Sequence, residues 1–551
     1  MTQPYRILVV DNSSHVRQSL DMLLTAQGYQ VFVTDNPVEA RRLLRKGRVH
    51  LAVVDIRLED DDDPQDVSGL ELAASLDPLV ARIVITGYDS HENMRRALRP
   101  ILPDNIPAND YVLKRDGPAV LLEAIERVCR DEIDVNWSLE LEWETISAQG
   151  IGAEVELDQT DLPREVLADE VEELLQRLFY ETDHVLVSPL LPPALVHASS
   201  QRGAVILKVQ PRYQKERWGV PVVCKVNERS QVEVETDNYN RYVKGFIGGN
   251  YHTNLEQVKC THYLGGIRYS MVGARLDAVR DFSDFYRQAS VTEISQVLTH
   301  LFKDVCHYWH ANRYSQERIN LTQLYRETLR LTDEKLQQML IQHFPRQQEC
   351  TVHFEGLPGA FTNPLRWIWD KELASLTYRC VTHGDLHGHN IFVDEHQQVW
   401  LIDFGRTGVG HALRDFITLE TDIKFALLET VDLTTLYHFE VALLQPDRLD
   451  DLPALPDPVT DLDVRKAFQV ISALRHIAVK IIEYNSDALP YYQGLFYQTL
   501  NVARLEKIDA NKKQHALLSA ALICERLDTC GQRWSRVSVT SRQDISTPQS
   551  D

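Results

Sequence analysis

Three residue types that phosphoryl transfer requires lie close together in the second half of the chain. Asp385 could orient an attacking hydroxyl group and accept its proton. Asn390 offers a neutral carbonyl oxygen and Asp403 offers a carboxylate, and Mg²⁺ prefers hard oxygen ligands of this kind. Two short apolar runs between them, at 391–393 and 399–402, predict a hairpin that would bring both metal ligands to one end. These residues therefore predict a magnesium-dependent phosphoryl-transfer site.

The same segment resembles the catalytic core of the aminoglycoside and choline kinase branch of the protein-kinase-like fold. The resemblance rests on His383-Gly384-Asp385, on Asn390, and on Asp403-Phe404-Gly405. It implies an ATP- and Mg²⁺-dependent phosphotransferase, in which His383 is structural and Asp415 braces the catalytic loop. The alternative is a pseudokinase that keeps the fold and has lost the chemistry.

A phosphotransferase of this kind needs a lysine that pairs with the nucleotide phosphates and a carboxylate that holds this lysine. Lys225 ends an apolar strand-like run and is our candidate, with Lys208 in the preceding run as its rival. An acidic helix-like segment follows at 232–243, so we expect Glu235, or else Glu233, to hold Lys225.

Two features of the surrounding segment complete the expected small lobe. The stretch 188–203 would cover the phosphates, but it has no G-x-G-x-x-G pattern, which the aminoglycoside-kinase branch tolerates. The stretch 258–273 predicts two further strands, with Gly265-Gly266 as the turn between them.

The first 130 residues alternate strand-like and helix-like segments. Repeated βα units of this length predict a parallel sheet with helices on both faces. The polar residues that follow four of the strands are Asp11, Asp55, Thr86 and Lys114. Because the site of such a sheet lies at the carboxyl ends of its strands, we expect these side chains to meet there. The pocket suits phosphorylation of a carboxylate, with Asp11 and Asp55 as Mg²⁺ ligands.

This region resembles the receiver domains of two-component response regulators, which have a flavodoxin-like, doubly wound α/β fold. By that resemblance Asp55 accepts a phosphoryl group from a sensor histidine kinase, Thr86 contacts the phosphoryl oxygen and Lys114 pairs with the anion. The family usually has two acids after the first strand, whereas here the pair is Asp11-Asn12. Asn12 can still coordinate Mg²⁺ through its carbonyl oxygen, with lower affinity. The alternative is a degenerate receiver that only mediates contacts.

The patterns divide the chain into five segments, the second part being an α+β, two-lobed protein-kinase-like domain. A strand and an amphipathic helix with its acids opposite the apolar side form the connector, separated by an acidic loop at 150–161. The expected segments are a receiver at 1–132, a connector at 133–180, a small lobe at 181–275, a helical large lobe at 276–534 and a disordered tail at 535–551.

Composition limits the possible classes of function. A formal net charge of −22 over 551 residues argues against a nucleic-acid-binding surface. No apolar run approaches the roughly 20 residues that cross a bilayer, so we expect no membrane span. The eight cysteines form no C-x-x-C pair, which predicts reduced thiols in a cytoplasmic protein.

The sequence therefore predicts a cytoplasmic response regulator whose output domain is a kinase-like phosphotransferase for an acceptor that the sequence does not identify. The alternative is a signalling adaptor that binds partners through both modules without phosphoryl chemistry in the second. A transcription factor is disfavoured because the chain has no helix-turn-helix candidate with a basic face.

Overall fold

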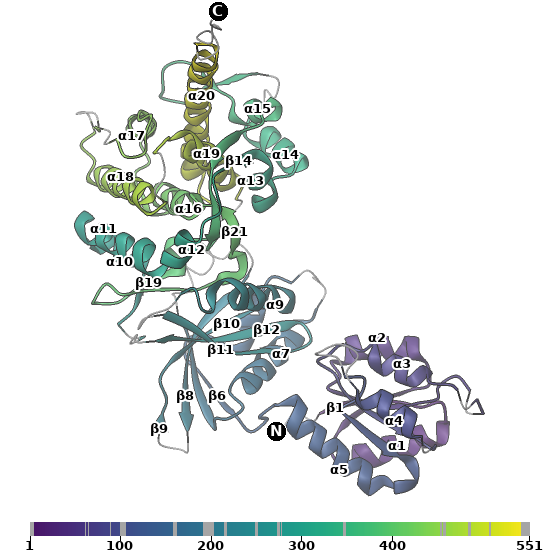
Figure 1. Cartoon of the computed structure of the whole chain (residues 1–551). Coiled ribbons are helices and arrows are strands. Elements are labelled where there is room, and N and C mark those ends of the chain that lie inside the picture. The colour runs from purple at the N-terminus through teal and green to yellow at the C-terminus, as the bar shows by residue number, and fades with distance from the viewer. Residues whose placement is uncertain are drawn as a thin grey trace, which may run out of the picture. The chain divides into compact units, whose positions relative to one another are not determined.

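The structure is a computed structural model, shown as a cartoon in Figure 1. The described residues fall into two compact units, Met1–Val232 with Glu256–Tyr269, and Glu233–Leu255 with Ser270–Asp551. The residues described are 5–540 without 61, 64, 89, 100–105, 158–161, 191–202, 214–216, 248–251, 273–275, 277, 345–348, 452–453, 456–458, 483–485 and 506–507, with only the backbone at 252, 272, 370 and 530–540.

The first unit begins with a parallel five-stranded sheet in the order β2-β1-β3-β4-β5, as expected for a flavodoxin-like receiver. Ile7 and Val9 of β1 pack in one core with α1 and α5, whereas Leu8 and Val10 pack in another with α2 and α3. Both faces of the sheet are therefore buried, which explains why its strands are almost continuously apolar. The elements are β1 (Arg6–Val10), α1 (Ser14–Ala26), β2 (Gln30–Thr34), α2 (Pro37–Gly47), β3 (Leu51–Asp55), α3 (Ser68–Ala74), β4 (Ala81–Thr86), α4 (His91–Leu98), β5 (Asp110–Leu113), η1 (Lys114–Asp116), α5 (Pro118–Val128) and the π-helical turn η2 (Cys129–Ile133).

A second, mixed sheet follows in the order β11-β12-β10-β8-β7-β6, with β9 beside β8. The predicted connector strand is β6, which pairs in parallel with β7, and the connector helix is α7. Part of the expected acidic loop at 150–161 is instead helix α6, whose N-cap Ser147 accepts a hydrogen bond from the Gly150 amide. The elements are β6 (Glu140–Trp143), α6 (Ala148–Glu154), α7 (Arg164–Leu178), β7 (His184–Pro189), β8 (Val205–Tyr213), β9 (Arg217–Trp218), β10 (Val222–Glu228), β11 (His252–Cys260) and β12 (Leu264–Val272).

The prediction of a turn at Gly265-Gly266 is wrong, because both glycines lie inside β12. A Cβ on Gly265 would lie 2.7 Å from Val232, and one on Gly266 would lie 2.6 Å from Leu178. Real Cβ atoms do not approach other atoms so closely, so these glycines let two side chains pack directly on the strand. The connection between the strands lies at 261–263 instead.

The acids of α7 are not all on a solvent face, contrary to the simple amphipathic pattern. Glu173 is 3% exposed and accepts hydrogen bonds from Arg6 at 2.7 Å and from Arg177 at 2.8 and 3.0 Å. His50, just before β3, lies 3.3 Å from the same carboxylate. Arg6 begins β1, so this buried cluster joins the amino ends of two receiver strands to α7 within the first unit.

Further polar contacts join the receiver to the second sheet. Arg229, which begins α9, donates to both carboxylate oxygens of Asp77, at 2.6 and 3.0 Å. The Tyr263 hydroxyl donates to the carbonyl oxygen of Arg45 at 3.1 Å. The receiver is therefore packed against the segment that follows it, and is not connected by a linker alone.

The second unit is largely helical, and α9 runs into it from the first unit. The predicted hairpin is present, since β19 and β20 pair antiparallel with Ile391 opposite Leu401. Helix α20 continues into the tail that we expected to be disordered from position 535, and residues 541–551 lie outside the described residues. The helices are α9 (Arg229–Asn238), η3 (Tyr239–Val243), α10 (Phe282–Gln288), α11 (Val291–His300), η4 (Leu301–Val305), α12 (His307–Ala311), α13 (Leu321–Leu329), α14 (Asp333–His343), α15 (Pro364–Trp367), η5 (Ile368–Asp370), η6 (Gly388–Asn390), η7 (Phe404–Arg406), α16 (Arg414–Asp422), η8 (Ile423–Leu427), α17 (Leu433–Leu444), α18 (Leu462–Ile482), α19 (Leu489–Arg504) and α20 (Ala510–Thr540). The strands are β13 (Arg280–Asp281), β14 (Glu317–Asn320), β15 (Thr351–Val352), β16 (Phe361–Thr362), β17 (Ala374–Thr377), β18 (Arg379–Thr382), β19 (Ile391–Val393), β20 (Val399–Leu401) and β21 (Gly408–His411).

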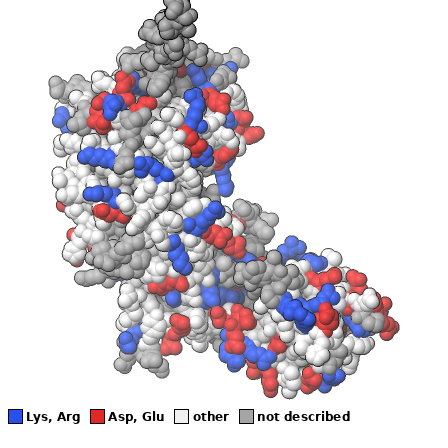
Figure 2. All heavy atoms as spheres, in the orientation of Figure 1, with Lys and Arg blue, Asp and Glu red and all other residues white. Residues whose placement is uncertain are grey.

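Charged side chains of both signs are interspersed on the face of the molecule drawn in Figure 2. Among the described residues, no helix combines the length and the apolar character that crossing a membrane requires.

Candidate functional site

The four predicted receiver residues lie at the carboxyl ends of neighbouring strands. Asp11 follows β1, Asp55 ends β3, Thr86 ends β4 and Lys114 follows β5. The Lys114 Nζ atom lies 2.6 Å from Asp55 Oδ2 and 2.8 Å from Asp11 Oδ2. Burial lowers the pKa of Lys114, but the two carboxylates raise it by more, so the lysine stays protonated. The ion pairs therefore bring Asp11, Asp55 and Lys114 into one pocket.

The same pocket offers oxygen atoms that fit a magnesium ion. Asp11 and Asp55 are 0% and 3% exposed, so their charges are shielded from bulk water. The Oδ1 atom of Asn12 is also buried and accepts no hydrogen bond from any described residue. A buried oxygen left without a donor is costly unless a cation or water satisfies it. Two carboxylates and this amide oxygen match the ligand preference of Mg²⁺.

In the second unit, the side-chain nitrogen and oxygen of Asn390 lie in different surroundings. Its Nδ2 atom donates to the Asp385 carbonyl oxygen at 2.9 Å, and its backbone carbonyl accepts from the Ile402 amide at 3.1 Å. With Nδ2 engaged on the loop, Oδ1 remains the atom available to a metal ion. The Ile402 contact fixes Asn390 next to the backbone that leads into Asp403.

Asp403 has a left-handed backbone conformation, with φ of +65°. This conformation is uncommon for a residue other than glycine, and such strain persists only where the surroundings enforce it. Here Glu235 accepts a hydrogen bond from the Phe404 amide at 3.1 Å, and Asn238 donates to the Gly405 carbonyl oxygen at 3.0 Å. Helix α9 therefore holds the turn that presents Asp403. The ring of Phe404 lies between those of Tyr239 and His383, with centroids 5.6 and 5.5 Å away.

Helix α16 holds the loop that carries Asp385. Asp415 accepts hydrogen bonds from the amides of His383 and Gly384, at 2.7 and 2.9 Å. Asp422, seven residues later on the same helix, accepts from the Gly388 amide at 2.7 Å. Residues seven apart share a helix face, so one face of α16 fixes both ends of the loop. The structural role expected for Asp415 agrees with these contacts.

Sequence reasoning missed Asp422 and a second support of the same loop. His389 Nδ1 lies 2.9 Å from a carboxylate oxygen of Asp281, a residue 108 positions earlier in the chain. No local spacing could have revealed either contact, because the partners come from distant segments. The buried ring of His383 contacts the Ile402 carbonyl oxygen at 2.9 Å, which agrees with the structural role expected for it.

Asp385 itself is accessible, with 21% of its side chain exposed. Arg406 Nη1 donates a hydrogen bond to its Oδ1 atom at 3.3 Å. Within the described residues of the second unit, the structure brings together Asp385, Asn390, Asp403 and Glu235. In the part of the chain that is described, no three His, Cys, Asp or Glu side chains form a metal site on their own.

Lys225 belongs to the first unit. It lies in β10 opposite Ile206 of β8 and Ile267 of β12, and is 3% exposed. Its expected pairing with Glu235 stays a prediction. The stretch expected to cover the phosphates lies mostly outside the described residues.

Comparisons with known proteins assign both parts of the chain. The model of the response regulator receiver domain family matches residues 7–126. The chemotaxis protein CheY of Treponema pallidum is 28% identical over 131 residues, which are 23% of this chain and 84% of that protein. A CheY-like receiver domain protein from Methanospirillum hungatei is 30% identical, with a TM-score of 0.20, over 23% of this chain and 96% of its own. A response regulator from Thermotoga maritima, solved in complex with Mg²⁺-BeF, is 25% identical, with a TM-score of 0.18, over 22% and 98% of the two chains.

The second part matches a different family model, ternary complex associated domain 9, at residues 201–340 and 352–501. These two segments together make up more than half of the chain. The β2-β1-β3-β4-β5 sheet and the pocket at its strand ends agree with the receiver assignment of the first part. The protein therefore belongs to the ternary complex associated domain 9 family and carries a response regulator receiver domain at its N-terminal end.

Proposed function

We propose that this protein is a response regulator that is phosphorylated on Asp55 and whose ternary complex associated domain is a Mg²⁺- and ATP-dependent phosphotransferase. The receiver implies a cognate histidine kinase as the phosphoryl donor. Thr86 would contact the transferred phosphoryl group, and Lys114 would neutralise its charge. Mg²⁺ bound by Asp11, Asn12 and Asp55 would offset the negative charge that gathers in the pocket during transfer.

The observation that carries the second half of the proposal is the arrangement around Asn390 and Asp403. The Asn390 amide nitrogen is engaged on the Asp385 backbone, and α9 holds Asp403 in a strained conformation. The amide oxygen of Asn390 and the carboxylate of Asp403 would be the ligands of a shared metal ion. Mg²⁺ at this position supplies charge neutralisation for the phosphates of a bound nucleotide.

The roles of the other residues follow from their chemistry. Asp385, partly exposed beside Arg406, would orient the acceptor hydroxyl and take its proton. Lys225 would pair with the nucleotide phosphates, and Glu235 would hold Lys225. Because positioning and charge neutralisation provide most of the catalysis in such enzymes, loss of Asp385 or Asp403 should lower the rate by orders of magnitude.

The test is the melting temperature of the full chain with and without ATP and Mg²⁺. A stabilisation that requires Mg²⁺ is expected for the wild type and should disappear in Asp403→Asn. Asp304→Asn is the matched control, since Asp304 is an exposed aspartate on η4 of the same unit. No stabilisation of the wild type at millimolar ATP would reject the enzyme and favour the adaptor, whose second domain binds partners without phosphoryl chemistry.

A further inference from the structure

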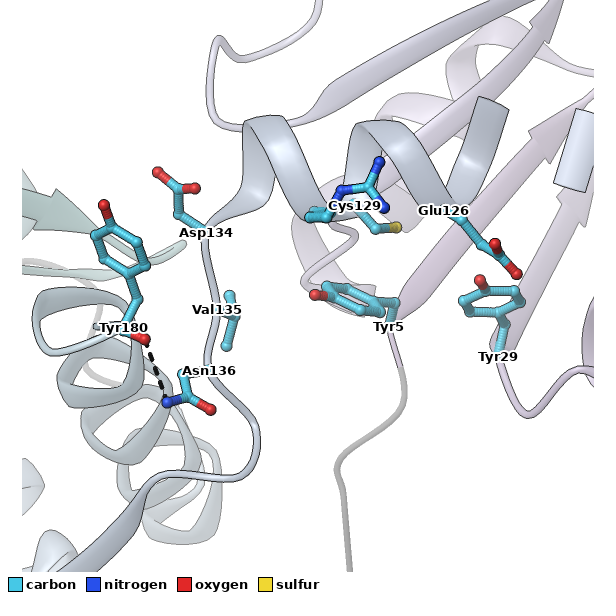
Figure 3. A pocket seen from close by; sticks show the side chains of 9 residues that line it. Tyr5, Tyr29, Glu126, Cys129, Asp134, Val135, Asn136 and Tyr180 are labelled. Atoms are coloured by element: carbon cyan, nitrogen blue, oxygen red, sulfur yellow. Dashed lines mark hydrogen bonds between the residues drawn. The ribbon is translucent and has the colours of Figure 1, made fainter. Parts of the chain in front are cut away.

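A cavity of about 500 Å³ lies where the receiver meets the segment that follows it, inside the first unit (Figure 3). This volume is within the range of small-molecule sites, about 300–1,000 Å³. Its walls come from the residues before β1 and β2, from α5 and η2, from 134–136, and from the residue two positions after α7. The lining residues are Tyr5, Tyr29, Glu126, Cys129, Arg130, Asp134, Val135, Asn136 and Tyr180.

At one end of this cavity the chain itself shows how a cation is held. The Lys259 Nζ atom lies 2.9 Å from Asp134 Oδ2. The same ammonium group lies over the ring of Tyr180, 5.8 Å from its centroid. A carboxylate and the face of a tyrosine therefore share one positive charge, by ion pairing and by the attraction of a cation to an aromatic ring.

The other end has the same kinds of group without a cation from the described part of the chain. Figure 3 shows the Glu126 carboxylate beside the ring of Tyr29, with Tyr5 next to them. The Glu126 side chain is exposed and makes no hydrogen bond or ion pair with any described residue. Burial, the Cys129 thiol and the Glu126 carboxylate raise the pKa of Tyr29 to about 12. The phenol therefore stays neutral, and its surroundings disfavour further negative charge.

Arg130, the only basic residue of the lining, does not pair with Glu126. The Arg130 side chain is 71% exposed, and its Nε atom donates to Asp131 at 3.0 Å. Cys129 is 4% exposed, and burial raises the pKa of its thiol to about 12, so it stays uncharged. This end of the cavity thus combines the rings of two tyrosines with an exposed carboxylate that has no partner among the described residues.

We propose that this cavity binds a small organic cation, with Glu126 as its counter-ion and the rings of Tyr5 and Tyr29 as its aromatic wall. The bound cation would repeat at this end the arrangement that Lys259 makes with Asp134 and Tyr180 at the other. The tyrosines before β1 and β2 belong to the receiver, whereas 134–136 and Tyr180 lie beyond it. A ligand that fills the cavity would therefore contact both sides of this junction. The proposal does not depend on the function proposed for the second unit.

Benzamidine and benzamide are a suitable pair of probes, because they have nearly the same shape and only benzamidine is charged. Their affinities for the full chain are measured by isothermal titration calorimetry. We expect benzamidine to bind at least about tenfold more tightly than benzamide, since an ion pair and a cation–aromatic contact both favour the charged probe. Equal affinities, or no binding of benzamidine at about 10 mM, would overturn the proposal.

Variants on α5 locate the site. Glu126→Gln should weaken benzamidine about tenfold and leave benzamide unchanged. Glu123→Gln is the matched control, because Glu123 is exposed on the same helix and does not line the cavity. Tyr29→Leu should weaken both probes, because it removes the aromatic wall. If Glu126→Gln and Glu123→Gln affect benzamidine equally, the cation binds elsewhere and the assignment of this cavity is wrong.

Discussion

Replacing Glu173 with Gln is expected to destabilise the first unit by about 3–5 kcal/mol. The carboxylate accepts hydrogen bonds from Arg6 and Arg177, and the side chains of the three residues are 3%, 7% and 9% exposed. Gln keeps the volume and removes the charge, so two buried guanidinium groups lose their counter-ion. Removing one partner of a buried ion pair costs about 3–5 kcal/mol, whereas an exposed pair contributes only about 0–1 kcal/mol. Burial therefore decides the size of the effect.

Urea unfolding of the full chain measures the loss, and amide hydrogen exchange of α7 and β1 locates it. Glu172→Gln is the matched control, because Glu172 immediately precedes Glu173 in the helix, is partly exposed and pairs with no described residue. It should change the free energy of unfolding by less than about 0.5 kcal/mol. Exchanging Arg6, Glu173 and Arg177 together for Met, Met and Leu should recover most of the stability, since no buried charge is then left alone. Equal stability of Glu173→Gln and Glu172→Gln would refute the reasoning.

Three further outcomes are expected. Lowering the pH from 6.5 to 4 should destabilise the first unit by up to about 3 kcal/mol, because burial lowers the pKa of His50 to about 4 and the unfolded chain binds the proton at a higher pH than the folded chain does. Above pH 6.5 His50 is neutral in both states, so the full stability is present there. Urea unfolding of His50→Asn should not show this pH dependence. Gly384→Ala should lower the melting temperature and abolish stabilisation by Mg²⁺ and ATP, because its Cβ would lie 2.2 Å from the Arg406 carbonyl oxygen. Gly356 has the same φ of +83° and nothing within 4 Å of an added Cβ, so Gly356→Ala should lower the melting temperature less. Binding of BeF₃⁻ and Mg²⁺ at the receiver should leave the hydrogen exchange of α7 unchanged, and faster exchange along the whole helix would contradict this.

The sequence was sufficient to predict the positions of site residues that lie at the ends of strands. Asp11, Asp55 and Lys114 could be placed together because each directly ends or follows a buried strand, and parallel strands present their carboxyl ends at one edge. The hairpin that carries Asn390 and Asp403 could be predicted for a related reason. Its two apolar runs are separated by a polar turn, and such a pattern leaves few other arrangements.

The sequence was insufficient where the role of a residue depends on a partner from a distant part of the chain. The spacing of α7 shows that Glu173 lies off the apolar stripe, but not that Arg6, 167 positions earlier, lies against it. Helical periodicity gives the faces of a helix and contains no information about the surface that packs on each face. For the same reason the sequence predicts a turn at Gly265 and Gly266, because the side chains that occupy the space of their missing Cβ atoms come from the distant helices α7 and α9.

The receiver strands β1 and β3 lie between two charged sites, the acid pocket at their carboxyl ends and the buried Glu173 cluster at their amino ends. Each has a phosphorylation-pocket acid at its carboxyl end, Asp11 or Asp55, and a member of the Glu173 cluster at its amino end, Arg6 or His50. Strands of five residues rise about 17 Å, so the two sites are well separated. Coupling free energies between distant sites are typically about 1–3 kcal/mol, whereas leaving one charge of such a cluster buried without its partner costs about 3–5 kcal/mol. We therefore expect phosphorylation of the receiver to act with the cluster intact, through changes at the carboxyl ends of the strands, as the BeF₃⁻ experiment would show.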